Sequence, residues 1–345
     1  MIDVGIVGAM GFTGAELIRI LDSHPGVRIR RLTDRTHIGK PYQEIYENFR
    51  HYDKNPETLA CTEDTIADIA GSCDVIFTAI PHGHATRMID GNLLSKVKVI
   101  DLSADFRLKD PEVYEHWYNV EHGAKDLLKE AVYGLCELRR EEIKKARLVA
   151  NPGCYTTCSI LPLYPLIKEG VIEKSDVIID AKSGVSGAGR STEQATQFCE
   201  ANENLKAYKI TAHRHTPEIE EQIGTEVIFT PHLIPMNRGV LITAYAKLTD
   251  DYSYSDVKAV YEKYYGNEYF VRLTKEGVFP ETKWVKASNF CDIGFIIEKK
   301  KRRIITVSAI DNIVKGASGQ AVQNMNILFG LDEKTGLAGA PVFPI

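Results

Sequence analysis

Residues 2–21 are IDVGIV-GAMGFTG-AELIRIL, and they determine the fold of the first part of the chain. Ile2–Val7 is short, apolar and rich in β-branched residues, which predicts a buried strand. Ala15–Leu21 has the apolar spacing of a helix, which we expect to end near Pro25 and Gly26. A strand, a glycine-rich turn and a helix in this order are typical of a dinucleotide-binding βαβ unit.

The glycine-rich turn has the features that a pyrophosphate needs. Gly8 permits the tight turn, Gly11 lets a phosphate approach the backbone, and Gly14 lets the helix and the strand pack closely. The N–H groups and the positive potential of the helix N-terminus would stabilise the phosphates. The predicted cofactor-binding residues of this turn are Gly8, Gly11, Phe12, Thr13 and Gly14. The alternative, a tight turn that binds nothing, is less favoured because the motif directly joins a strand to a helix.

The rest of the chain divides into two patterns. Strands predicted at residues 27–33, 74–80 and 97–102 alternate with helical stretches over about the first 150 residues, which is typical of a parallel sheet. From residue 151 onward strands outnumber helices, which indicates an α+β domain with a mostly antiparallel sheet. The strands predicted there are 177–182, 226–230, 240–247, 290–298 and 303–310, and the helices are 154–168, 257–265 and a glycine-punctuated helix at 314–331. We therefore predict an α/β protein with a Rossmann-like domain at residues 1–150 and a second domain at residues 151–313.

Composition excludes several classes of protein. The 345 residues, 44% hydrophobic and 26% charged, are typical of a globular protein of about two domains. No apolar run approaches the ~18 residues of a membrane span, and the start of the chain lacks the features of a signal peptide. A net charge of −5 gives no electrostatic basis for binding nucleic acid. The seven cysteines, an odd number, indicate free thiols in a reducing cytoplasm.

The end of the second predicted strand bears on the choice of cofactor. An acidic residue about 20 positions after the turn would bind the ribose 2′-hydroxyl of NAD, whereas an arginine would pair with the 2′-phosphate of NADP. Asp34 lies 20 residues after Gly14, and Arg35 follows it. Because neighbouring residues of a strand point to opposite faces, Asp34 is expected to point away from the cofactor. We therefore predict that Arg35 binds NADPH, which is preferred over NADH but not used exclusively.

NPGCYTTC at residues 151–158 is the strongest chemical signal. Pro152 and Gly153 break the preceding strand, so a helix is predicted to begin at about Cys154. There, the helix dipole and nearby N–H donors favour a thiolate, and the same donors can hold an oxyanion. The alternative is a small buried apolar residue, but the turn favours a nucleophile. Cys158, one helical turn further on, is interpreted as a packing residue.

Two pairs of histidines are candidates for proton transfer or metal binding. His213 and His215 lie in an extended segment just before a predicted helix, where an imidazole can exchange a proton with a substrate oxygen. A His-x-His pair also suits a metal, but this is the less favoured interpretation, and we predict no metal. His82 and His84 are interpreted as part of a polar loop.

Two arginines are candidates for anion binding. SGVSGAGR at residues 183–190 is a second glycine-rich loop whose N–H groups can line an anion site, and Arg190 can bind a phosphate or a carboxylate with two hydrogen bonds. Arg107 follows the end of a predicted strand. For each arginine the alternative is a surface ion pair.

Taken together, seven motifs resemble the N-acetyl-γ-glutamyl-phosphate reductase family of arginine biosynthesis, a relative of aspartate-semialdehyde dehydrogenase. The resemblance runs nearly end to end, and the combination is specific although no single motif is. The motifs are GAMGFTG at 8–14, DLSADFRL at 101–108, NPGCYTT at 151–157, SGVSGAGR at 183–190, HRHTPEI at 213–219, PHLIPMNRG at 231–239 and DNIVKGASGQAVQNMN at 311–326.

The resemblance implies roles for residues of the second domain. Cys154 would be the nucleophile and His213 the acid/base. Glu218 would orient or tune that histidine, and His215 would help to bind substrate. With these residues, the second domain would be the catalytic and oligomerisation domain, and the enzyme would be a homo-oligomer.

It also implies how substrate and cofactor are held. Arg107 and Arg190 would bind phosphate or the substrate carboxylate, Asn312 and Gly316 would approach the nicotinamide, and residues 314–345 would complete the first domain. The family favours NADP and commonly has Ser-Arg where this chain has Asp34 and Arg35. An aspartate at this position would repel a 2′-phosphate.

The implied reaction is the NADPH-dependent reduction of N-acetyl-γ-glutamyl phosphate, a small-molecule acyl phosphate, to N-acetyl-glutamate semialdehyde through a cysteine thioester. One alternative is the same chemistry on an aspartyl or aminoadipyl phosphate, which the size of the side-chain pocket would decide. A second is a non-catalytic NADP-binding sensor, in which Cys154 and His213 would be packing residues. The sequences around these two residues argue against a sensor, because a sensor needs neither.

Overall fold

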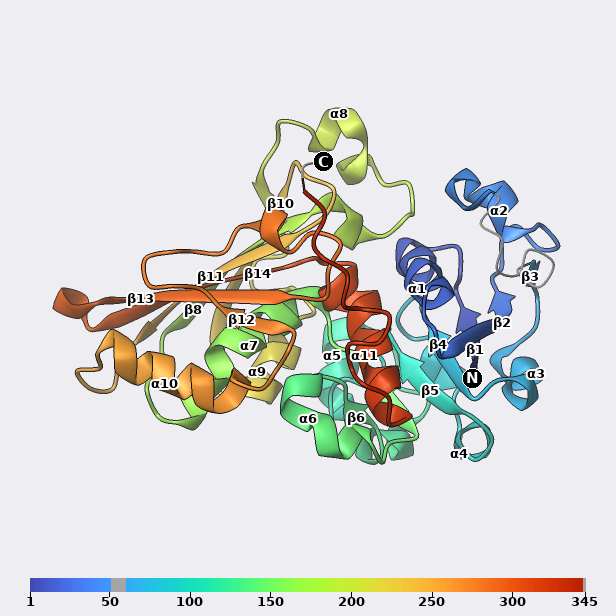
Figure 1. Cartoon of the computed structure of the whole chain (residues 1–345), viewed down its shortest axis with the longest axis horizontal. Helices are drawn as coiled ribbons and strands as arrows, with labels where there is room; N and C mark the ends of the chain where they lie inside the picture. The colour runs from blue at the N-terminus through green and yellow to red at the C-terminus, as the bar shows by residue number, and fades with distance from the viewer. Residues whose placement is uncertain (51–59, 344–345) are drawn as a thin grey trace. The chain divides into compact units, whose positions relative to one another are not determined.

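The computed structural model describes residues 1–50 and 60–343, which form two compact units (Figure 1). The first unit comprises Met1–Pro152 and Ala317–Ala338, and the second comprises Gly153–Gly316 and the residues from Gly339 onward. The first unit was predicted to end at residue 150 and to include all of 314–345, of which residues 344–345 lie outside the described part. Residues 339–343 instead belong to the second unit, where the N–H of Val342 donates to the carbonyl oxygen of Lys286 (3.0 Å).

The first unit is built on a parallel sheet in the order β3-β2-β1-β4-β5-β7-β6, which confirms the Rossmann-like prediction. The strand order reverses between β1 and β4, and ligands of open α/β sheets bind at such a switch point. The strands are β1 (Ile2–Val7), β2 (Val27–Thr33), β3 (Cys61–Thr62), β4 (Val75–Thr78), β5 (Lys98–Asp101), β6 (Val132–Tyr133) and β7 (Leu148–Ala150). The helices are α1 (Phe12–Asp22), α2 (Tyr42–Ile45), α3 (Ile66–Ile69), α4 (Gly91–Leu94), α5 (Pro111–Tyr118), α6 (Cys136–Ile143) and α11 (Gly319–Leu328).

Helix α11 completes the first unit through buried amide side chains. The amide nitrogens of Gln320 and Asn324 donate to the carbonyl oxygen of Gly134 (2.9 and 2.8 Å), and that of Asn324 also donates to Asn151 Oδ1 (3.1 Å). The segment predicted as one helix over 314–331 is divided in the structure, because a π-helical turn at Val314–Ser318 precedes α11. Such turns are rare and are frequent at functional sites.

The second unit contains a mixed sheet in the order β12-β13-β14-β11-β8-β10-β9. In it β12 pairs with β13, and β8 with β10, in parallel, whereas its other neighbouring strands are antiparallel, as the prediction of a mostly antiparallel sheet requires. The strands are β8 (Val177–Gly184), β9 (Lys206–Ala207), β10 (Val227–Ile234), β11 (Val240–Lys247), β12 (Val271–Leu273), β13 (Cys291–Glu298) and β14 (Arg303–Ile310). The helices are α7 (Cys154–Lys168), α8 (Phe198–Ala201), α9 (Thr216–Ile223) and α10 (Tyr254–Tyr265).

Helix α7 packs against β8, β11 and β14 on one face of this sheet, and α9 and α10 pack against α7 (Figure 1). On the other face, five apolar side chains form a row across five strands, each opposite its neighbour in register. The row consists of Ile228, Ile178, Tyr245, Ile305 and Ile296. At its two ends Ile228 and Ile296 are 56% and 47% exposed, so this face leaves apolar surface in contact with solvent.

No helix among the described residues is long and apolar enough to span a bilayer.

Candidate functional site

The glycine-rich turn between β1 and α1 leaves space where a phosphate would bind. A Cβ on Gly8, which has a φ of +85°, would lie 2.3 Å from the carbonyl oxygen of Ala79, and one on Gly14 would lie 2.5 Å from that of Gly8. Only glycine therefore fits at these two positions. A Cβ on Gly11 would meet nothing closer than 3.8 Å, so the backbone of Gly11 borders open space. These residues fit a dinucleotide whose pyrophosphate lies at the start of α1.

Asp34 is oriented toward this turn, and the expectation that it points away is wrong. Its Oδ2 accepts a hydrogen bond from the N–H of Met10 (3.2 Å), and its Oδ1 accepts from the N–H and the hydroxyl of Thr36 (2.9 and 2.8 Å). Strand β2 ends at Thr33, so the alternation of side chains along a strand no longer governs the next residue. Arg35 is exposed and makes no ion pair with any residue in 1–50 or 60–343.

In the second unit, Cys154 is the first residue of α7, as predicted, and is partly exposed. The first N–H groups of a helix have no carbonyl partner within it, so they are available to a bound oxyanion. Glu218, 1% exposed, supports this turn: its Oε1 accepts from the N–H of Gly153 (3.0 Å) and from the hydroxyl of Thr156 (2.9 Å). These contacts connect Glu218 to the residues on either side of Cys154, whereas its predicted partner was His213.

Gly316 lies directly against Cys154. A Cβ on Gly316 would lie 2.6 Å from Cys154 Cβ, so any side chain there would displace the cysteine. The N–H of Gly316 donates to the carbonyl oxygen of Asp311 (2.9 Å), which holds the glycine in place. The close approach explains the glycine without reference to a cofactor, and its predicted contact with a nicotinamide stays a prediction.

His213 is buried and held by both ring nitrogens. Its Nδ1 accepts from the N–H of His215 (3.1 Å), and its Nε2 lies 3.4 Å from the hydroxyl of Tyr208. The pKa of His213 is lowered to about 2, mainly by burial and to a lesser degree by the positive charges of His215 and Lys209. The negative charge of Glu218 raises this pKa, but it is a lesser influence. The ring is therefore neutral, and its proton is on Nε2, because Nδ1 is an acceptor.

Around His213 lies a cluster of aromatic rings from several elements of the second unit. The ring centroid of His213 is 4.8 Å from that of His215, 5.5 Å from that of Tyr155 and 5.4 Å from that of Phe229. The pKa of Tyr208 is raised to about 12, mainly by burial; the hydrogen bond with Tyr155 lowers this pKa and negative charge on Cys154 raises it, both to a lesser degree. Tyr155 follows Cys154 directly in α7, so the start of this helix borders the cluster.

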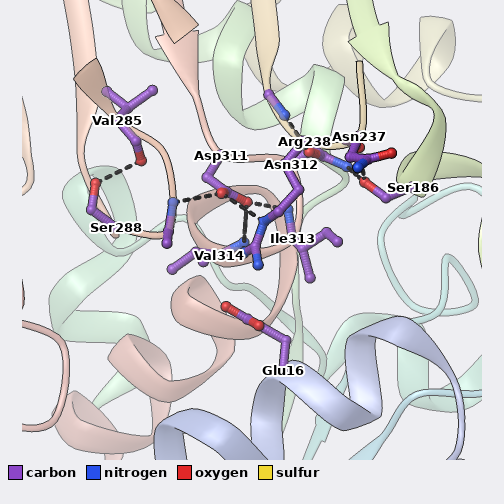
Figure 2. Close-up of polar contacts among 12 residues, drawn as sticks. Glu16, Ser186, Asn237, Arg238, Val285, Ser288, Asp311, Asn312, Ile313 and Val314 are labelled. Atoms are coloured by element: carbon purple, nitrogen blue, oxygen red, sulfur yellow. Dashed lines mark hydrogen bonds and ion pairs between the residues drawn. The ribbon is translucent and has the colours of Figure 1, made fainter. Parts of the chain in front are cut away.

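Buried at the end of β14, Asp311 joins three loops (Figure 2). Its carboxylate pairs with Arg238 through two hydrogen bonds (Nε–Oδ2 2.9 Å, Nη2–Oδ1 3.2 Å). It also accepts from the backbone N–H groups of Ala287 (2.7 Å), Ile313 (2.9 Å) and Val314 (3.1 Å). Asp311 thereby fixes the segment that leads to Gly316. Asp311 and Arg238 lie in motifs of the sequence, but no pattern in the sequence indicated this role.

Asn312, the next residue, joins the loop 183–190 to the turn that contains Arg238 (Figure 2). Its Oδ1 accepts from the N–H of Gly239 (2.7 Å), and its Nδ2 donates to the hydroxyl of Ser186 (2.9 Å). Ser186 in turn donates to the carbonyl oxygen of Asn237. These bonds hold the glycine-rich loop 183–190 against the turn between β10 and β11. The side chain predicted to approach a nicotinamide is thus already hydrogen bonded at both ends.

The two predicted anion-binding arginines lie in different units. Arg190 is exposed at the end of the loop 183–190, in the same unit as Cys154, His213 and His215. Arg107 is buried in the first unit, where its Nη2 donates to the carbonyl oxygen of Leu102 (2.9 Å). His82 is likewise in the first unit, and its Nδ1 accepts from the N–H of Ala104 (3.1 Å).

Within the part of the chain that the structure describes, no three His, Cys, Asp or Glu side chains are grouped so that they could hold a metal ion.

Comparisons with known proteins agree with the two units. A family model of the semialdehyde dehydrogenase NAD binding domain matches residues 3–146, and one of the semialdehyde dehydrogenase dimerisation domain matches residues 154–312. The chain is 54% identical over 350 residues to the N-acetyl-gamma-glutamyl-phosphate reductase of Lachnoclostridium phytofermentans, and the match covers 100% of both. It is 53% identical over 342 residues to the protein of that name in Campylobacter jejuni, covering 97% of this chain and 98% of the relative.

Solved structures show the same fold at low sequence identity. Aspartate semialdehyde dehydrogenase II from Vibrio cholerae superposes with a TM-score of 0.71 at 17% identity, covering 96% of this chain and 99% of that one. Aspartate semialdehyde dehydrogenase with NADP from Candida albicans gives a TM-score of 0.67 at 14% identity, covering 95% and 98%.

Proposed function

This chain belongs to the N-acetyl-γ-glutamyl-phosphate reductase family, and from that premise we propose that it reduces N-acetyl-γ-glutamyl phosphate to N-acetyl-glutamate semialdehyde through a thioester on Cys154. It is thus an oxidoreductase of arginine biosynthesis. The observation that carries the mechanism is a partly exposed cysteine at the start of α7, followed directly by Tyr155, whose ring packs against that of a buried, neutral histidine.

In the first step the Cys154 sulfur attacks the acyl carbon, and the carbon–oxygen bond to phosphate breaks, which gives a thioester and free phosphate. When bound, the reduced nicotinamide supplies the hydride that reduces this thioester. The resulting alkoxide then re-forms its carbonyl group, the carbon–sulfur bond breaks, and the electron pair returns to Cys154 as the thiolate. The protein must therefore stabilise negative charge on one oxygen in both steps.

The N–H groups at the start of α7 and the Nε2–H of His213 would stabilise that oxygen. A neutral histidine suffices, because an alkoxide that collapses to an aldehyde needs a hydrogen bond and no net proton. A neutral ring supports a role for His213 as a hydrogen-bond donor to the substrate oxygen, which is less than the full acid/base role that we predicted for it. Glu218 would hold the backbone of the nucleophile, and His215, Arg190 and Arg107 would bind the carboxylate and phosphate of the substrate.

The reverse reaction tests this function. With inorganic phosphate and oxidised cofactor, we expect reduced nicotinamide to accumulate with N-acetyl-glutamate semialdehyde, and far more slowly with aspartate semialdehyde or an aminoadipate semialdehyde. Absorbance of the reduced nicotinamide measures each rate. A preference for another semialdehyde would show that the enzyme acts on a different acyl phosphate by the same reaction. Cofactor binding without turnover of any semialdehyde would favour a non-catalytic sensor.

The cofactor is a nicotinamide dinucleotide, and we propose that it is NADPH with relaxed selectivity. The proposal is supported by Arg35, which is exposed and able to bind a 2′-phosphate. Asp34 opposes strict selectivity for NADPH over NADH. Its carboxylate is directed at the N–H of Met10 in the phosphate-binding turn, and its negative charge would repel a 2′-phosphate.

Substitutions at these two positions should move the selectivity in opposite directions. Arg35→Ala should raise the KM for NADPH far more than that for NADH, because it removes the partner of the 2′-phosphate. Asp34→Ser should increase the preference for NADPH by removing a like charge. Values of kcat/KM for both cofactors, measured on the wild type and on both variants, check this. The proposal would be refuted if the wild type preferred NADH and Arg35→Ala left kcat/KM for both cofactors unchanged. That result would indicate that Asp34 binds the ribose 2′-hydroxyl of NADH.

The matched dimerisation domain supports a homo-oligomer, and we propose that the apolar row ending in Ile228 and Ile296 forms part of the contact. A solution mass equal to that of one 38.6 kDa chain would refute this. We also propose that the enzyme is cytoplasmic. All seven cysteines lie in the described part of the chain, and none forms a disulfide there, as in a reducing compartment.

A further inference from the structure

Tyr208 lies at the end of β9, five residues before His213, and contacts its reactive nitrogen. The backbone N–H of Tyr208 donates to the carbonyl oxygen of Pro231 (3.1 Å), which fixes this residue against β10. Its hydroxyl oxygen is 3.4 Å from His213 Nε2 and 3.4 Å from the hydroxyl oxygen of Tyr155. The Tyr155 hydroxyl donates to the carbonyl oxygen of His232 (3.0 Å). No pattern in the sequence predicted that these hydroxyl groups join His213 to the carbonyl oxygen of His232.

The two ends of this series of hydrogen bonds fix its direction. At one end, the backbone N–H of His215 can only donate, so His213 Nδ1 accepts and the ring proton lies on Nε2. At the other end, a carbonyl oxygen can only accept, so the single proton of Tyr155 is used there. Tyr155 must then accept from Tyr208, and Tyr208 in turn must accept from His213 Nε2–H.

The backbone between Tyr208 and His213 is strained in a way that supports a functional placement. Lys209 and Thr211 have φ angles of +46° and +59°, in the left-handed region, which a β-branched residue such as threonine rarely adopts. The N–H of Ala212 donates to the carbonyl oxygen of Lys209 (3.0 Å), which closes the turn. This conformation directs the chain back so that Tyr208 and His213 face each other, and strain of this kind is concentrated at active sites.

We propose that Tyr208 is a positioning residue that orients the ring of His213 by accepting from its Nε2–H, so that this nitrogen is placed to donate to the oxygen of the reacting acyl group. The inference rests on the proposed function of Cys154 and His213. At 3.4 Å the contact is longer than an ordinary hydrogen bond, so an incoming carbonyl or alkoxide oxygen, which accepts the proton more strongly, can replace the Tyr208 hydroxyl as the acceptor of the His213 Nε2–H without breaking a strong interaction. Tyr208 would hold the ring in the correct orientation before the substrate arrives.

Tyr208→Phe in the full-length enzyme tests this inference, because it removes one oxygen and keeps the ring. We expect kcat to fall about 3- to 10-fold, the effect of one hydrogen bond, with the KM for each substrate nearly unchanged. In nitrogen NMR of histidine-labelled enzyme, His213 should be Nε2-protonated in the wild type and in the variant, because the N–H of His215 still donates to Nδ1, but the Nε2–H should exchange with solvent faster in the variant, because it has lost the hydroxyl that accepts it. Tyr155→Phe is the matched control: it keeps the ring that packs against His213 and removes a hydroxyl that contacts Tyr208 and the carbonyl oxygen of His232, so both kcat and the exchange rate of the His213 Nε2–H should stay close to the wild type.

A Tyr208→Phe enzyme with unchanged kcat, or with an unchanged exchange rate of the His213 Nε2–H, would overturn the inference. So would a loss of activity that Tyr155→Phe reproduces, because it would reflect packing of the cluster. Failure of the underlying function is distinguishable, since it would leave Cys154→Ser and His213→Asn active as well.

Discussion

Replacing Cys154 by serine is expected to abolish turnover while cofactor binding stays near the wild-type level. A serine hydroxyl at the start of α7 is not ionised at neutral pH, so it cannot replace the thiolate, and the loss of a nucleophile costs several powers of ten in rate. The glycine-rich turn belongs to the first unit and Cys154 to the second, so the substitution leaves the turn unchanged. Steady-state kinetics and titration of nucleotide fluorescence measure the two properties separately.

Cys158→Ser provides the control for this experiment. Cys158 is fully buried, burial raises the pKa of its thiol to about 12, and its sulfur lies 3.3 Å from the hydroxyl of Ser308. It is therefore a packing residue, and its serine variant should keep most of the activity. If the Cys154→Ser enzyme retained more than about a tenth of kcat, covalent catalysis through this residue would be excluded.

The second large effect is expected at His213. His213→Asn keeps a polar side chain but withdraws the ring nitrogen that donates toward the substrate oxygen, so kcat should fall by about 10²-fold or more. His215→Asn should act mainly on KM, because its backbone N–H, which holds the His213 ring, is retained. Parallel kinetics on the two variants check this assignment. The reverse pattern, a kcat effect at His215 and a KM effect at His213, would exchange the two roles.

The pH dependence of the wild type follows from the same residue. Since burial lowers the pKa of His213 to about 2, the ring is neutral across the ordinary assay range and would become charged only in strong acid. The plot of kcat/KM against pH should therefore have no limb due to His213 between about pH 5 and about pH 8, where an unperturbed histidine titrates. A limb near about pH 6.5 that disappears in His213→Asn would show that the charged ring takes part.

Local patterns in the sequence were sufficient to predict much of the fold. The apolar run Ile2–Val7 and the glycine-rich turn predicted β1 and the start of α1, and Pro152 with Gly153 placed the start of α7 at Cys154. Both features depend on neighbouring residues only. The π-helical turn at Val314–Ser318 was missed because it depends on close packing between Gly316 and Cys154, which are distant in sequence.

The polar contacts of the site could be predicted less well from the sequence. Cys154 and His213 have chemistry that suggests catalysis wherever they occur, and the structure places both in the second unit. Asp311, by contrast, pairs with Arg238 at a separation of 73 residues, and no periodicity signals such a pair. Asp34 was expected to follow strand alternation, but its orientation is set by the N–H of Met10, a contact that only the folded turn creates.

The position of α11 in the chain also determines when the first unit can be finished during synthesis. All strands of its sheet precede residue 151, yet the carbonyl oxygen of Gly134 and the side chain of Asn151 bind amides of α11, which begins at Gly319. A nascent chain emerging from the ribosome must therefore wait for the intervening second unit before these buried polar groups find their partners. The nucleotide-binding half of the protein, although begun first, is completed last, and a chain that stops short of residue 319 encodes no finished copy of it.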